Sequence, residues 1–355
     1  MVRHCSNPDR SFCLGFLIFI GSVLFIGSCS ERDHKGLELS PSSSPKGTGN
    51  SYQELYLFDS IRIVLDIPDA PINGSLATKT LVLYALPNGN SIEWSMGKQE
   101  TNSDNWHFNI QHINAQTQWL RKQGSDFILA YLEAPKLSWP GWKRSHEDYQ
   151  QHIRNLVDTL RTITHTETVV LSSHSGGGSF INGFIEASKP IPVWVERIVF
   201  IDSNYGYDTA IGDKLSKWIS SDSDKHLSVF AYNDSVALYE GKPFVSATGG
   251  TWYRSKMMLR EFSGQYAFVK TEKATLIKNR SMNNQILIIL KKNPDREIFH
   301  TQQVELNGFI HSLLFDTEIE DYGYSYFEAR CYGDFISETI PEFVSLDISG
   351  KTGLK

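Results

Sequence analysis

Residues 168–185 combine a buried-strand pattern, a short polar turn and a helical pattern, and no other part of the chain restricts the fold as strongly. The segment opens with β-branched and aliphatic residues at 168–171, as a buried strand does. It closes with apolar residues spaced as one face of a helix: Phe180, Ile181, Phe184 and Ile185. The turn Ser173-His174-Ser175-Gly176-Gly177 joins the two. A sharp turn of this kind strains the backbone of its central serine and requires small residues on either side. The alternative is an ordinary flexible loop rich in Ser and Gly.

The composition excludes several classes of function. The chain has 355 residues, 40% of them hydrophobic, which is enough for one large domain or two smaller ones with a sizeable core. Its formal net charge of −6, with no basic run, argues against nucleic acid as a partner. The four cysteines (Cys5, Cys13, Cys29 and Cys331) form neither a disulfide framework nor a CxxC metal pattern. We therefore expect no metal site and no cofactor.

The N-terminal 28 residues have the pattern of a signal peptide. Arg3 and Arg10 precede an apolar run at 12–26 that is too short for a comfortable membrane-spanning helix. The sequence Ile26-Gly27-Ser28-Cys29 then resembles the lipobox of bacterial lipoproteins. The resemblance implies cleavage after residue 28, a lipid on Cys29, and an extracytoplasmic protein attached to a membrane at the periplasmic face or the cell surface. Plain secretory cleavage and an uncleaved anchor are the alternatives.

Residues 29–52 are polar and rich in Ser and Pro, so they predict a flexible tether. From residue 53 to 355, strand patterns alternate with helix patterns, which predicts one α/β domain with a mostly parallel sheet and helices on both faces. We expect the last strand at 296–306. Ligands of such sheets bind at the carboxyl ends of the strands. The polar residues that fall at expected strand ends are Asn88, Gly89, Ser175, Asp202, Asp234 and His311.

From about residue 55 to 330, the chain resembles the α/β-hydrolase family. The resemblance rests on the Ser173–Gly177 turn between a strand and a helix, a later Asp after a strand, and a still later His. It implies a serine hydrolase in which Ser175 is the nucleophile. A serine hydroxyl needs a histidine to take its proton, and the histidine needs an acid to orient it.

Two histidines follow the candidate acids. His300 shares a face of the expected last strand with Ile298 and Gln302, which suggests a structural role. His311 lies beyond Asn307-Gly308 at an expected loop-to-helix boundary, so we predict that His311 is the base. Asp234 is the predicted acid because the family more often uses that strand, and Asp202 is the alternative acid.

The oxyanion of an acyl-transfer reaction needs two hydrogen-bond donors. The resemblance implies the backbone N–H of Gly176 as one donor and the loop of Asn88 and Gly89 as the source of the other. An ordinary Pro-Asn-Gly turn is the alternative for that loop.

The expected substrate is a small-molecule or carbohydrate-linked ester, or an amide. Aromatic residues gather in loops near expected strand ends, where they either stack on a sugar or aryl group or simply pack the loops: Trp139, Trp142, Tyr205, Tyr207, Trp252 and Tyr253. They suit an esterase that acts on polysaccharide. A lipoprotein that binds carbohydrate in the same cleft without catalysis is the rival hypothesis.

Overall fold

The computed structural model describes residues 50–58, 60–69, 78–97, 110–337 and 339–347. They belong to one compact unit, Ser40–Lys355. The expected signal peptide, Cys29 and most of the expected tether lie outside the described residues. Within the described ranges, no helix is long and apolar enough to cross a membrane. The first strand begins at Asn50, a little before the expected domain boundary at residue 53.

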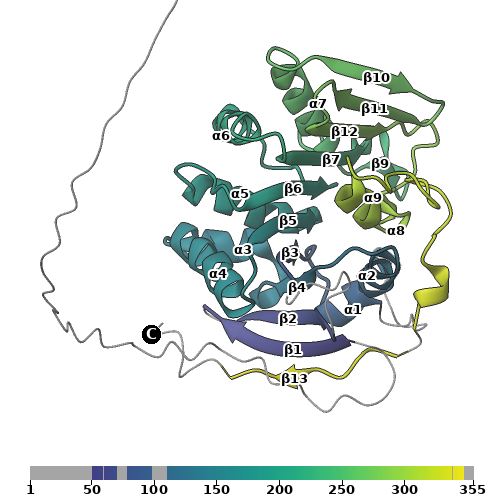
Figure 1. The fold of residues 1–355 in the computed structure, drawn as a ribbon. Helices are drawn as coiled ribbons and strands as arrows, with labels where there is room; N and C mark the ends of the chain where they lie inside the picture. The colour runs from purple at the N-terminus through teal and green to yellow at the C-terminus, as the bar shows by residue number, and fades with distance from the viewer. Residues whose placement is uncertain (1–49, 59, 70–77, 98–109, 338, 348–355) are drawn as a thin grey trace, which may run out of the picture. The chain divides into compact units, whose positions relative to one another are not determined.

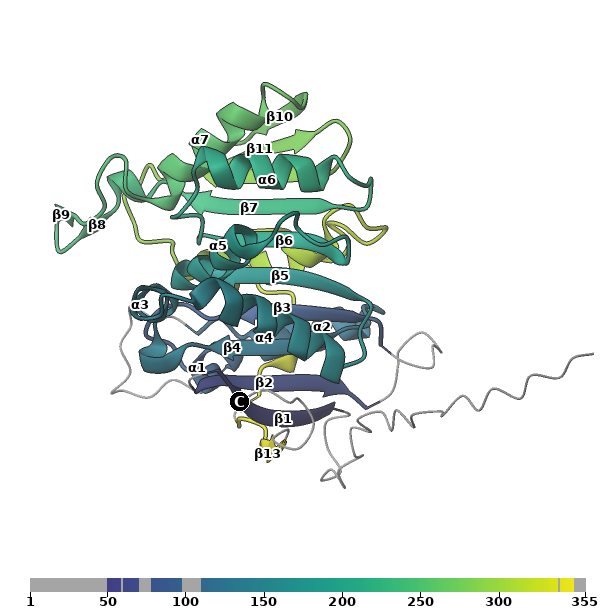
Figure 2. The ribbon, with the colours of Figure 1, turned by 90° about the vertical axis from the view of Figure 1, so that its left-hand side faces the viewer.

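The described residues form a large mixed sheet of 11 strands (Figures 1 and 2). Its order is β10-β11-β12-β7-β6-β5-β3-β4-β2-β1-β13. The strands in chain order are β1 Asn50–Leu57, β2 Ile61–Pro68, β3 Thr80–Ala85, β4 Ile128–Glu133, β5 Thr168–His174, β6 Val195–Ile201, β7 His226–Tyr232, β10 Phe268–Glu272, β11 Leu276–Ser281, β12 Ile286–Lys291 and β13 Val344–Ser345. A small separate hairpin joins β8 Leu238–Tyr239 to β9 Lys242–Pro243. From β4 to β12, neighbouring strands run parallel, so their carboxyl ends meet along one edge of the sheet.

Helices cover both faces of the sheet, on opposite sides in Figure 1. One face carries α3 Trp139–Ser145, α4 Tyr149–Ile163, α5 Gly178–Ala187 and α6 Thr209–Ile219. The other carries α1 Ile92–Met96, α2 Ile113–Lys122, α8 Gln302–Glu305 and α9 Gly308–Leu314. Helix α7 Thr251–Phe262 lies on the part of the sheet that holds β7 and β12, and it packs on both strands and on α6. Short 3-10 turns follow β4, β5 and β7 (Pro135–Leu137, Ser175–Gly177 and Asp234–Val236), and a fourth lies at Gly333–Phe335.

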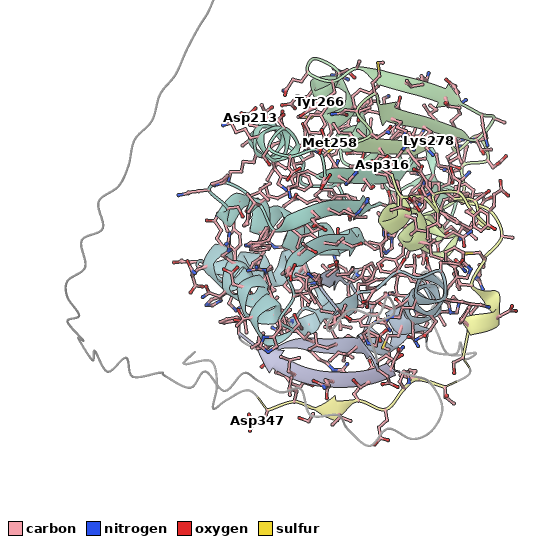
Figure 3. All side chains as sticks on the ribbon, in the orientation of Figure 1. Asp213, Met258, Tyr266, Lys278, Asp316 and Asp347 are labelled. Atoms are coloured by element: carbon pink, nitrogen blue, oxygen red, sulfur yellow. The ribbon has the colours of Figure 1, made fainter. Side chains whose placement is uncertain are left out.

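Buried side chains fill the space between the sheet and both helical layers (Figure 3). All seven residues of β7 and all six of β12 are buried, as expected for strands covered on both faces. Helix α5 turns Phe180, Ile181, Phe184 and Ile185 into this core, each at most 1% exposed. The strand–turn–helix segment read from the sequence therefore lies at the centre of the sheet.

The expected strand at 296–306 is wrong in the structure. Its first half is a loop after β12, and its second half includes α8. The side chain of Asn293 closes this loop, because Asn293 Oδ1 accepts from the N–H of Glu297 at 3.0 Å and Asn293 Nδ2 donates to the Glu297 carbonyl at 2.7 Å. Arg296 adopts a left-handed backbone with φ 63°, which ends any extended pattern. The last strand of the parallel block from β4 to β12 is therefore β12, and β13 later pairs parallel to β1 at the other side of the sheet.

Candidate active site

Ser175 occupies a strained turn at the carboxyl end of β5. Its φ is 52°, in the left-handed region that a non-glycine residue adopts only at a cost. Strand β5 ends at His174, the 3-10 turn spans Ser175–Gly177, and α5 begins at Gly178. This geometry aims the serine side chain outward from the end of a buried strand, and the residue is half-buried.

The glycines after Ser175 allow the helix to approach the sheet closely. A Cβ atom on Gly177 would lie 2.0 Å from the carbonyl oxygen of Ala85 on β3, and one on Gly178 would lie 1.9 Å from that of Ser203 after β6. Ser173 stands where this type of turn usually has glycine. Its hydroxyl is 2.8 Å from the Ser203 hydroxyl, so its side chain is accommodated by a buried hydrogen bond.

A histidine–carboxylate pair lies beside this turn. His300 Nδ1 is 2.5 Å from Asp202 Oδ2, and the Asp202 side chain is fully buried while the His300 side chain is 26% exposed. Asp202 follows β6 and has a φ of 44°, also in the left-handed region. The rings of His300 and His174 are 4.4 Å apart, and His174 immediately precedes Ser175. The pair of His300 and Asp202 is thus held next to the Ser175 turn.

A second carboxylate, Asp234, follows β7 and is linked to Asp202 through Thr251. The Thr251 N–H donates to Asp234 Oδ2 at 2.8 Å, and the Thr251 hydroxyl donates to Asp202 Oδ1. The other Asp234 oxygen, Oδ1, is buried without a hydrogen-bond partner among the described residues. Burial, and then the neighbouring charge of Asp202, raises the pKa of Asp234 to about 6.

The structure does not bring His311 and Asp234 together. His311 lies on α9, is 1% exposed, and stacks its ring on Tyr326 at 5.5 Å in the core of the face that carries α2 and α9. Its Nδ1 lies 3.1 Å from the Tyr324 hydroxyl and 3.5 Å from Asp321 Oδ1. Burial lowers the pKa of His311 to about 4. The geometry therefore favours His300 with Asp202 over the predicted pair, because the residue taken for a strand position lies in the loop after β12.

A buried chain of hydrogen bonds holds the backbone of His300. The Tyr84 hydroxyl donates to Gln111 Oε1 at 2.6 Å, Gln111 Nε2 lies 3.0 Å from His174 Nδ1, and His174 Nε2 lies 3.1 Å from the His300 carbonyl. With Gln111 as donor, His174 accepts at Nδ1 and donates at Nε2, which is the neutral form of its ring. Burial lowers the pKa of His174 well below its usual range, which agrees with that form.

Asn88 and Gly176 lie together where the oxyanion donors were expected. A Cβ atom on Gly176 would lie 2.1 Å from Asn88 Oδ1, so the Asn88 amide packs directly on the Gly176 backbone. Gly89 is placed differently from the expectation. Its N–H donates to the Leu137 carbonyl at 2.9 Å, so this donor is already used within the chain. Of the two residues expected in that loop, Asn88 is therefore the remaining candidate for the second oxyanion donor.

A groove of about 450 Å³ opens at Ser175 and is lined by α5, α3 and the loop after β6. The lining includes Asn88, Gly176, Asn182 and Tyr205. Of the six aromatic residues singled out in the sequence, Tyr205 alone lines this groove. Trp139, Trp142 and Tyr207 are at most 3% exposed and pack the core instead.

The sequence reading missed Thr251, Gln111 and the polar residues of α5 that face the groove. Thr251 follows Gly249-Gly250, a loop without a recognisable catalytic pattern, so nothing local indicated its contact with two carboxylates. The polar positions Ser179, Asn182 and Glu186 do repeat at helical spacing, and this signal was available beside the apolar face.

No protein-family model and no curated protein sequence matches the chain. Solved structures are similar to it at low identity. The siderophore hydrolase EstB from Aspergillus nidulans is 9% identical over 79% of this chain and 98% of its own, with a TM-score of 0.40. An IroE-like serine hydrolase from Shewanella oneidensis is 12% identical over 75% and 80%, with a TM-score of 0.43. A cold-adapted esterase from an Arctic intertidal metagenomic library is 8% identical over 76% and 97%, with a TM-score of 0.37.

The fold itself is defined by the geometry of this chain. A mostly parallel sheet is covered by helices on both faces, and a strained serine follows its central strand β5. Ser175, Asp202 and His300 come in the order Ser, Asp, His along the chain, each after a strand of that sheet. The chain has the α/β-hydrolase fold.

Proposed function

We propose that this protein is a serine hydrolase that cleaves carboxylic esters through an acyl-enzyme. The observation that carries the proposal is the strained Ser175 next to the bonded pair of His300 and Asp202. The sharp turn from strand to helix imposes the left-handed backbone of Ser175, and strained residues of this kind cluster at active sites.

In the proposed reaction, the Ser175 hydroxyl attacks the ester carbonyl carbon while a ring nitrogen of His300 takes its proton. Because Nδ1 of His300 is hydrogen-bonded to Asp202, the nitrogen that accepts the serine proton is Nε2. The imidazolium then gives the proton to the departing alkoxide, which leaves as an alcohol. Water attacks the acyl-enzyme by the same route, releases the acid and restores Ser175.

The oxyanion of each tetrahedral intermediate needs donors that are already in place. The Gly176 N–H lies at the start of a helical segment, where unsatisfied N–H groups and the helix dipole favour negative charge. Asn88, packed on Gly176, is the proposed source of the second donor.

Among the described residues, no hydrogen bond joins Ser175 to His300. Catalytic hydrogen bonds are often long before substrate binds and tighten in the complex. The loop from Asn293 to His300 is the part of the site that adjusts in this proposal. The His300 side chain on this loop is 26% exposed, whereas Asp202, which anchors it, is fully buried.

A fluorophosphonate probe tests the nucleophile, since it labels activated serines covalently. We expect labelling of the wild-type protein at Ser175, no labelling of Ser175→Ala, and unchanged labelling of Ser263→Ala, a surface serine after α7. His300→Ala should slow labelling by several orders of magnitude. Labelling that persists in Ser175→Ala would instead support a binding protein that uses the groove without catalysis.

The cell location remains part of the proposal. Lipid attachment at Cys29, which the N-terminal sequence predicts, would hold the hydrolase on a bacterial membrane at the periplasmic face or at the cell surface. Cys29 itself lies outside the described residues.

A further inference from the structure

The groove beside Ser175 has a polar floor formed by one face of α5. Ser179, Asn182 and Glu186 follow Ser175 at intervals of four, three and four residues, and all four line the groove. Residues at this spacing lie one above another on a helix. Because the opposite face of α5 is buried and apolar, this polar row runs from the candidate nucleophile along the helix for about three turns.

Asn182 is the central residue of this row, and its amide oxygen lacks a hydrogen-bond donor. The residue is 5% exposed, and its Oδ1 is buried with no hydrogen-bond partner in the described residues. Its Nδ2 lies directly against Gly206, because a Cβ atom added to that glycine would be 2.3 Å from it. A buried amide oxygen without a donor is unfavourable, and a ligand hydroxyl that donated a hydrogen bond to it would remove this cost.

The walls of the groove have two further features. Tyr205 lines one wall and is 40% exposed, although its hydroxyl end is buried and has its pKa raised by burial and by the nearby Asp202 and Asp234. The far end of the groove is formed by Lys143 and Glu186, which make an ion pair with 2.6 Å between Nζ and Oε2. The Tyr149 hydroxyl also donates to Glu186 Oε2 at 2.6 Å. A long alkyl chain laid in this groove would take the ion pair out of water and would offer no donor to Asn182 Oδ1.

We infer that the groove binds the hydroxylated part of a carbohydrate-like ester. Asn182 bonds its hydroxyl groups and Tyr205 packs on the apolar face of its ring. The inference rests on the proposed ester hydrolysis at Ser175 and adds the class of substrate. The reaction is then cleavage of an acyl group from a sugar hydroxyl, in which water supplies the oxygen of the released acid and the sugar leaves as the alcohol.

Release of acetate from two esters measures this preference: an acetylated methyl xyloside and octyl acetate. We expect wild-type kcat/KM to favour the sugar ester by at least about tenfold, equal to roughly 1.4 kcal/mol. Asn182→Leu keeps the size of the side chain and removes its polar atoms, so it should reduce the ratio about tenfold. Tyr205→Ala should reduce it in the same direction. Asn155→Leu, the same exchange on α4 outside the groove, should leave the ratio as it is.

A preference for octyl acetate would overturn the inference. So would a sugar preference that survives both Asn182→Leu and Tyr205→Ala in variants with wild-type melting temperatures, because the sugar would then bind elsewhere. Hydrolysis of 4-nitrophenyl acetate separates the sugar preference from ester hydrolysis itself. If that activated ester is cleaved while the sugar preference is absent, the groove assignment alone fails. If none of the three esters is cleaved, ester hydrolysis itself fails.

Discussion

Asp202 and Asp234 follow neighbouring strands and are linked through one threonine, so the site holds two carboxylates close to one imidazole. The direct bond to His300 comes from Asp202. Residue types and chain order could not decide between the two acids, because both satisfy the pattern. Likewise, the alternation of Ile298, His300 and Gln302 predicted a strand. The structure instead has a loop around His300, which the side chain of Asn293 closes. What decided both assignments was contact between residues far apart in the chain.

Replacement of each acid by asparagine separates their roles. Asp202→Asn removes the charge that orients His300, so turnover of 4-nitrophenyl acetate should fall by roughly 10⁴-fold, as in the best-characterised triad. Asp234→Asn removes a charge that makes no direct bond to the ring, so its loss should be far smaller. Melting temperatures of both variants serve as the folding control. A nearly inactive Asp234→Asn beside an active Asp202→Asn would return the acid role to β7.

At the scale of elements, the strands and helices near the site followed from local patterns. The apolar run of β5 and the spacing of the apolar residues in α5 were sufficient to place the Ser175 turn. Backbone geometry sets the side-chain repeat of a strand and that of a helix, so both can be recognised locally. The loop after β12 was not predictable in this way. Its shape depends on Asn293, which also donates to the Asn233 carbonyl at the end of β7 at 3.1 Å. One side chain therefore connects two strand ends and the segment that carries the base.

Asn293→Ala tests this connection. The variant loses three partly buried hydrogen bonds to backbone groups, so we expect its free energy of unfolding to fall by about 1–3 kcal/mol. We also expect a lower kcat at nearly constant KM for 4-nitrophenyl acetate, since His300 is less well held. Asn283→Ala, an exposed change at the other end of β12, is the control. A destabilised Asn293→Ala with wild-type kcat would show that the loop positions His300 without this residue.

Over the whole domain, histidines buried in the neutral state connect stability to pH. Burial lowers the pKa of His311 to about 4, from about 6.5 in the unfolded chain. Between these values the unfolded chain binds more protons than the folded one, so this contribution to stability is complete above pH 6.5 and decreases as the pH falls toward 4. His174 acts with the same sign.

His311→Gln should therefore reduce the acid sensitivity of the fold. In urea unfolding at pH 7.5 and pH 4.5, the wild-type protein should lose up to about 3 kcal/mol more than the variant between the two conditions. His165→Gln, at an exposed position after α4, should behave as the wild-type protein does. Equal losses in His311→Gln and wild type would mean that His311 does not stay neutral in the fold.

The two outer strands of the sheet bear on self-association. An outer strand offers unpaired N–H and C=O groups to any other extended chain, and long apolar outer strands join molecules into continuous sheets. Here β13 has two residues, and β10 carries Lys270 and Glu272, ion-paired at 2.6 Å, beside the exposed Val269. A second molecule that paired with β10 would have to strip water from these charges, which discourages edge-to-edge assembly. The short β13 and the charged β10 therefore disfavour extension of the sheet from one molecule to the next.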